Sequence, residues 1–207
     1  MSNGILVRAI AIVVSIVFVV GSWITSGSPD TAFVRYFSIA VFISSIAYLI
    51  WDRWLWKLPL SQLIPGVPRD VSGTWSTLLE SLWVDPSTGA TVDPKTVYVV
   101  IRQTSSQATL SLLSDESSSR SSIARVVKEG DAWLVHYVYT NEPRVDLRGR
   151  SAIHHGSGVL TAVGSPVKRL AGSYWTDRES KGALNLTDRS SRFAEDFDEA
   201  KELFVQD

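Results

Sequence analysis

The segment of this sequence with the most side chains suited to binding a ligand runs from Ala171 to Gly182. If it is a β-strand followed by a turn, alternation places Tyr174 and Thr176 on one face of the strand, and Arg178 and Lys181 follow in the turn. An arginine can hold a phosphate through two parallel hydrogen bonds, and an aromatic ring can stack on a nucleobase. The segment therefore favours a site for an anionic ligand that carries a ring.

Other cations and rings could extend this site. Arg102 ends an earlier strand-like segment, and Arg150 closes a short arginine-rich stretch. Tyr137 and Tyr139 could line the same cavity. A second interpretation stays open, because aromatic residues at this spacing are also typical of an ordinary core, and charged residues in a turn are typical of a surface pair.

The sequence offers little for catalysis. It has no cysteine, which excludes thiolate nucleophiles and cysteine-ligated metals. Its three histidines include the adjacent His154 and His155, whose side chains would lie on opposite faces of a strand and could not easily share a metal ion. There is no glycine-rich loop of the kind that holds a nucleoside triphosphate, and no nucleophile elbow. We expect a binding protein without a cofactor or metal, not an enzyme.

The chain from residue 71 to about residue 189 predicts short β-strands joined by turns. The expected strands are 71–83, 96–103, 107–113, 121–128, 132–140, 156–163, 168–176 and 183–188. Regular short strands with hairpin connections favour an antiparallel meander, and closure into a barrel removes exposed sheet edges. An eight-stranded barrel is either filled by side chains or holds one small ligand. We therefore predict an eight-stranded antiparallel β-barrel.

Two apolar stretches precede this region. Ile5–Ile24 and Thr31–Trp51 are each about as long as the roughly 20 residues that a helix needs to cross a bilayer. They predict a two-helix transmembrane hairpin over residues 1–57. The basic residues that flank the pair place both of its ends, and the domain that follows, on the cytoplasmic side. A cleaved signal peptide fits less well, because its apolar core is usually shorter.

The two remaining segments flank the barrel. Residues 58–70 contain three prolines, which favour a stiff, extended linker. Ser190–Val205 spaces its phenylalanines as one face of an acidic amphipathic helix. We expect it to pack as a lid on the barrel end, and a helix that binds a partner is the alternative. Residues 71–207 thus form a β-barrel domain with a C-terminal helix. Outside residues 1–60, 16 basic and 19 acidic side chains leave a net charge of −3, which argues against a nucleic-acid polymer as partner.

Two short motifs resemble a known family. Ser72-Gly-Thr-Trp75 opens the expected barrel, and a Gly-x-Tyr-x-Thr-x-Arg pattern ends at Arg178. Together with the architecture, they resemble the SMODS-associated two-transmembrane β-strand-rich effectors of CBASS anti-phage systems. The resemblance implies that the barrel binds a cyclic di- or oligonucleotide made by a partner nucleotidyltransferase. Binding would drive self-association of the membrane spans, disrupt the bacterial inner membrane and kill the infected cell.

The resemblance also ranks the candidate ligand contacts. It implies that Tyr174, Thr176 and Arg178 contact the nucleotide, whereas Lys181, Arg102 and Arg150 are selected only by charge and position. Three other functions stay open: an effector of the same architecture that a nucleotide holds inactive, a membrane-tethered lipid-binding barrel, and an enzyme acting on lipid or nucleotide.

Overall fold

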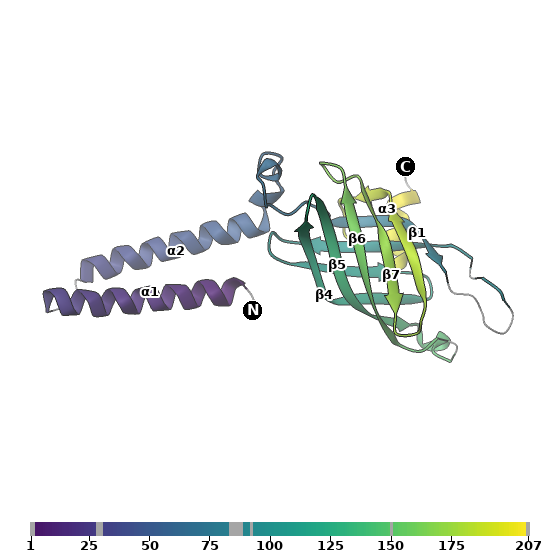
Figure 1. The fold of residues 1–207 in the computed structure, drawn as a ribbon, viewed down its shortest axis with the longest axis horizontal. Coiled ribbons are helices and arrows are strands. Elements are labelled where there is room, and N and C mark those ends of the chain that lie inside the picture. The colour runs from purple at the N-terminus through teal and green to yellow at the C-terminus, as the bar shows by residue number, and fades with distance from the viewer. Residues whose placement is uncertain (1–2, 28–30, 83–88, 92, 150, 206–207) are drawn as a thin grey trace. The chain divides into compact units, whose positions relative to one another are not determined.

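The computed structural model describes all residues except 1–2, 28–30, 83–88, 92, 150 and 206–207 (Figure 1). It divides into two compact units, Met1–Leu58 and Pro59–Asp207. The first unit contains α1 (Asn3–Ser26), α2 (Thr31–Arg53) and a short 3₁₀ helix, η1 (Leu55–Lys57).

The helices α1 and α2 occupy the two apolar stretches of the sequence. The rings of Phe18 and Phe37 stack between them, with centroids 6.0 Å apart. Ser15 and Ser45 donate side-chain hydrogen bonds to carbonyls one turn earlier in their own helices, over 2.7 and 2.8 Å. Within the described part of the chain, no helix is long and apolar enough to cross a membrane. The transmembrane hairpin stays a prediction from the sequence.

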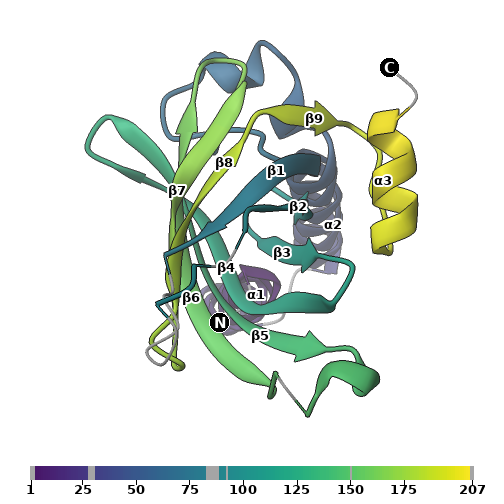
Figure 2. The same ribbon diagram turned by 90° about the vertical axis from the view of Figure 1, so that its right-hand side faces the viewer.

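The second unit is an antiparallel β-barrel. The strands follow one another around the sheet from β1 to β8, and pairing of β8 with β1 closes it (Figure 2). The predicted eight-stranded meander barrel is therefore confirmed. Among the described residues the sheet has nine strands, because two short ones, β8 and β9, share the eighth position beside β1. The strands are β1 (Gly73–Ser81), β2 (Lys95–Gln103), β3 (Ala108–Leu113), β4 (Ser117–Glu129), β5 (Ala132–Pro143), β6 (His154–Val163), β7 (Arg169–Thr176), β8 (Lys181–Leu186) and β9 (Asp188–Ser190).

The expected strand 183–188 is divided in two by the structure. β8 pairs with the second half of β1, and β9 pairs with its first half in a register shifted by one residue. At the break the Thr77 hydroxyl donates to the Asn185 carbonyl over 2.9 Å and accepts the Asn185 amide over 3.3 Å. A side chain thus replaces the backbone partner where the register changes, which the sequence pattern did not indicate.

The core fills the end of the barrel where the chain enters β1. Fully buried side chains from β1, β2, β5, β6, β7 and β8 meet there: Trp75, Ile101, Val135, Leu160, Leu170 and Leu186. The Trp75 indole N–H donates to the Val71 carbonyl over 2.9 Å, so this buried polar atom is satisfied. The solid core at one end leaves the other end of the barrel for a cavity.

The C-terminal helix α3 (Phe197–Val205) begins later than predicted, because residues 188–190 form β9 and Asp196 caps the helix by accepting the Glu199 amide over 2.8 Å. It also packs in a different place. Phe197 and Phe204 lie against Tyr98 on the outer face of β2, with ring centroids 5.5 and 5.6 Å away. The expectation of a lid on the barrel end is wrong: α3 covers part of the barrel wall (Figure 2).

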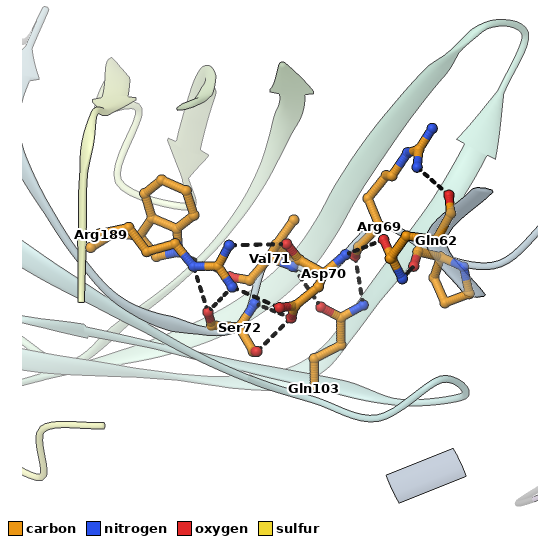
Figure 3. Close-up of polar contacts among 9 residues, drawn as sticks. Gln62, Arg69, Asp70, Val71, Ser72, Gln103 and Arg189 are labelled. Carbon is orange, nitrogen blue, oxygen red and sulfur yellow. Dashed lines mark hydrogen bonds and ion pairs between the residues drawn. The ribbon is translucent and has the colours of Figure 1, made fainter. Parts of the chain in front are cut away.

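Residues 59–72 fold onto the barrel instead of extending throughout. They include a 3₁₀ helix, η2 (Ser61–Leu63), and a polar network (Figure 3). The Arg189 guanidinium lies 2.9 Å from the Asp70 carboxylate, and the Gln103 side chain bonds the Val71 amide and the Arg69 carbonyl over 2.9 and 3.0 Å. The chain before β1 is thus fixed to β2 and β9.

Candidate functional site

A cavity of 460 Å³ opens at the end of the barrel opposite the core. The mouth is formed by the end of β1, the start of β2, and the connections β3–β4, β5–β6 and β7–β8. Its wall combines apolar side chains with hydroxyl, amide and charged groups. The wall includes the polar and aromatic residues Tyr137, Tyr139, Asn141, Tyr174, Thr176 and Arg178.

Three tyrosines form the aromatic wall, and each lies across from a glycine on the neighbouring strand. Tyr139 pairs with Gly156, Tyr137 with Gly158 and Tyr174 with Gly182. A Cβ atom on these glycines would lie 2.4 Å from Tyr139 Cζ, 2.3 Å from Tyr137 Oη and 2.6 Å from Tyr174 Cε1. The rings therefore lie over backbone that only glycine leaves free.

Burial affects the titration of these tyrosines. Desolvation, followed by the charges of neighbouring groups, raises the pKa of Tyr137 and Tyr139 far above the usual value. Desolvation also raises the pKa of Tyr174, while a hydrogen bond with Ser81 opposes that shift. All three phenols are therefore neutral at physiological pH and present hydroxyl groups and ring faces to the cavity.

A polar corner lies where β4 and β5 meet the mouth. The buried Asn141 donates through its amide nitrogen to the hydroxyls of Ser117 and Ser119, over 3.0 and 2.9 Å. These two bonds use both amide hydrogens of Asn141, so its side-chain carbonyl oxygen can accept a hydrogen bond from a further donor. Such an arrangement suits the hydrogen-bonding edge of a nucleobase.

Charged groups are placed at the rim. The Lys95 ammonium lies 2.9 Å from the Glu116 carboxylate, so this pair is neutral as a unit. Arg178 instead donates to the Ser151 hydroxyl over 3.1 Å and lies 3.4 Å from the Ala152 carbonyl and from His154 Nδ1. Its contacts among the described residues are uncharged acceptors or a histidine ring. No carboxylate among the described residues forms an ion pair with this guanidinium.

The structure brings together three of the six residues selected from the sequence. Tyr174, Thr176 and Arg178 line one side of the cavity. The Thr176 hydroxyl lies 2.7 Å from that of Ser180 and accepts the Arg178 amide over 3.2 Å, which shapes the turn that carries the guanidinium. The alternation expected along this strand is observed, since Trp175 points outward and is exposed.

The other three residues lie elsewhere or outside the description. Arg102 follows the inward-facing Ile101, so its side chain lies on the outer surface, where it pairs with Glu195 and stacks over the Phe193 ring. Lys181 is exposed and is not part of the cavity wall. Arg150 lies outside the described residues.

Comparison with known proteins agrees with this architecture. Residues 67–188 match the family model for "Cap15, cyclic dinucleotide receptor domain", which is more than half of the chain. This chain belongs to the Cap15 family. A Staphylococcus schleiferi protein named "CD-NTase-associated protein 15" is 29% identical over 149 residues, covering 72% of this chain and 76% of the relative. The resemblance to CBASS effectors is therefore confirmed.

Several cavity residues of this Cap15-family barrel could not be selected from the sequence. Asn141, Ser117 and Ser119 come from strands whose ends were predicted too short, at 140 and at 121. A signal was present in Gly156 and Gly158, which alternate within a strand and mark a face where another side chain approaches closely. Within the part of the chain that the structure describes, no cluster of His, Asp and Glu is suited to hold a metal ion.

Proposed function

We propose that the cavity of this Cap15-family barrel binds a cyclic dinucleotide and that the chain is a receptor in CBASS anti-phage defence. The observation that carries the proposal is one cavity holding tyrosine rings, a hydrogen-bonding asparagine and an arginine at the rim. Its 460 Å³ lies within the range of small-molecule sites, roughly 300–1,000 Å³. Family membership supports the same ligand class.

Each part of the wall matches one part of a cyclic dinucleotide. The Tyr137, Tyr139 and Tyr174 rings would stack on bases, and Asn141 would accept a hydrogen bond from a base N–H group. Arg178 would bind a phosphate oxygen at the rim, with Thr176 holding the turn in place. Closing the ring of the dinucleotide reduces the conformational entropy that binding must offset, which suits a cavity with a fixed wall.

We further propose that nucleotide binding promotes self-association and membrane disruption by the N-terminal hairpin. The support comes from the sequence: two apolar stretches of about 20 residues, flanked by basic residues whose distribution favours a cytoplasmic barrel. A partner nucleotidyltransferase would supply the ligand, and the bacterial inner membrane would be the target. The ligand acts only through a difference in affinity between the isolated and the assembled state.

One observation favours a different ligand. Leu79, Leu110, Leu112 and Leu184 also line the cavity, and an apolar wall suits an acyl chain. A lipid-binding barrel is therefore the second candidate. The dinucleotide accounts better for the Asn141 corner and for Arg178, because an acyl chain offers no hydrogen bond to the Asn141 carbonyl oxygen and no negative charge to the Arg178 guanidinium.

The test is thermal unfolding of the full chain in detergent micelles, with cyclic di-AMP, cyclic di-GMP, cyclic GMP–AMP and a linear dinucleotide as probes. A ligand that binds only the folded state raises the melting temperature. Arg178→Ala should weaken the affinity for the dinucleotide at least about tenfold, since a charged hydrogen bond contributes about 1.5–3 kcal/mol. The same ligand concentration should then raise the melting temperature less than in the parent protein.

Arg169→Ala is the matched control, because this exposed arginine lies at the other end of the same strand. It should respond as the parent does. No response to any cyclic dinucleotide, together with stabilisation by phospholipid acyl chains, would replace the nucleotide receptor with the lipid-binding barrel.

A further inference from the structure

Strand β4 has an unpaired edge that no part of the proposed ligand site uses. It pairs with β5 along its whole length, from Ser117 to Glu129, but with β3 only at Ser118–Arg120. A register shift follows between Ser121 and Ile123, and the Ser121 hydroxyl accepts the Leu110 amide over 2.8 Å. Beyond it, the last two residues of β3, Thr109 and Ala108, pair with β2 but not with β4, and β3 ends there.

Residues 123–129 therefore form one side of a hairpin that projects past its neighbour (Figure 2). A strand edge presents backbone N–H and C=O groups in a row, which is a template for pairing with another strand. Ala124 and Val126 face the barrel interior and keep the edge extended and anchored. Ile123, on the outer face, leaves 63% of its surface exposed.

The sequence of this edge is complementary to itself. If two copies meet through a two-fold axis perpendicular to the sheet, the strands run antiparallel and outward residues face outward residues. With Val127 on the axis, Arg125 of each copy lies opposite Glu129 of the other, which gives two opposite-charge pairs. Lys128 then lies opposite Val126, so the lysine that would otherwise repel a like strand meets no second cation.

Registers centred on residue 125 or residue 128 are less favourable. An axis at residue 125 places two arginines opposite each other, and an axis at residue 128 does the same with two lysines. Glu129 already contacts His136 over 2.9 Å within its own hairpin, and its second oxygen is left for an arginine. Arg125 is exposed and has no ion pair among the described residues.

We propose that two copies of this chain associate by antiparallel pairing of the β4 edges, residues 123–129, about Val127. This edge lies at the barrel end where β1 begins, because β4 runs opposite to β1 in the meander, and the cavity mouth lies at the other end. The dimer therefore leaves the cavity open and needs no nucleotide to form.

The absence of cysteine in the chain allows a direct test. Directly opposed residues of antiparallel strands have Cα atoms about 4.5–5.5 Å apart, within the range that a disulfide spans. Val127→Cys in the full chain, oxidised in detergent without nucleotide, should give a disulfide-linked dimer. Val138→Cys is the control, since this outward residue lies on β5, which has neighbours on both sides, and it should stay monomeric.

The register is tested by charge and by mixing. Arg125→Cys and Glu129→Cys should cross-link with each other when mixed, and each alone should not. In the Val127→Cys background, Arg125→Glu should reduce cross-linking several-fold, and adding Glu129→Arg should restore it. Equal cross-linking at positions 127 and 138, or no dimer at 127, would overturn the proposal. Neither readout depends on whether the cavity binds a nucleotide.

Discussion

The contact between Gly158 and Tyr137 allows the sharpest test of the cavity wall. In Gly158→Ala the new methyl group would lie 2.3 Å from Tyr137 Oη, 2.4 Å from Cζ and 2.7 Å from Cε1. The ring must move by about 1.1 Å or more to restore an ordinary contact, and it has little room because Tyr137 is buried and the Tyr139 ring lies 5.8 Å away.

Overpacking of this kind costs about 1–3 kcal/mol. For a unit of this size, each kcal/mol lowers the melting temperature by roughly 2–4 °C. We therefore expect a loss of about 2–12 °C, measured by near-ultraviolet circular dichroism, which reports aromatic packing. Ser157→Ala is the matched control: its side chain lies on the other face of β6, and its effect should stay within about 0.5 kcal/mol.

Combining Gly158→Ala with a change of Tyr137 tests whether the clash with the Tyr137 ring causes the loss of stability. In Tyr137→Leu the shorter side chain removes the atoms that the new methyl group meets. Gly158→Ala should then cost nothing further, giving a coupling of about 1–3 kcal/mol in a double-mutant cycle. An equal loss in both backgrounds, or a Gly158→Ala protein as stable as the Ser157→Ala protein, would refute the assignment of Gly158 as the space for the Tyr137 ring.

Three further predictions concern the barrel. Asp70→Ala should destabilise it by about 1–3 kcal/mol in thermal unfolding, because the side chain bonds Arg189 and the Ser72 amide and hydroxyl; Asp198→Ala, an exposed carboxylate, should not. Stability should fall as pH rises above about 10, because the unfolded chain releases the protons of Tyr137 and Tyr139 there while the folded barrel retains them; titration of tyrosine absorbance should show these phenols ionising only on unfolding. Asn141→Leu should weaken cyclic dinucleotide binding about tenfold, while Asn185→Leu, outside the cavity, should not.

The sequence predicted the facing of side chains along β7 better than it predicted which residues line the cavity. Alternation from Gly172 to Thr176 correctly separated inward from outward side chains, because facing direction depends only on position within one strand. The same rule places Arg102 outside once its neighbour Ile101 is known to face inward. Selecting Arg102 by its charge and its position at the strand end did not use that relation.

At the β3–β4 corner, the local sequence pattern does not predict the strand that the structure shows. Ser117–Ser122 is poor in the residues that favour strands, yet it is strand, because β5 supplies pairing partners from Pro143 to Tyr139. Strand propensity expresses fit to a pleated surface more than an intrinsic preference, so partners outweigh composition here. The polar corner at Asn141 follows from that pairing.

The relation between strands is set by turns and bulges, and this decides which residues meet. Tyr137 and Tyr139 face inward wherever β5 is placed, but only the observed register puts glycines beside both rings. A shift of one residue would place Ser157 beside a ring and turn the glycines away. The alternating glycines of β6 and the alternating tyrosines of β5 thus form a single packing arrangement. It can be recognised only when the register between the two strands is known. The same reasoning applies to β4, where the irregularity at Ser121 ends pairing with β3 and leaves the self-complementary edge beyond it.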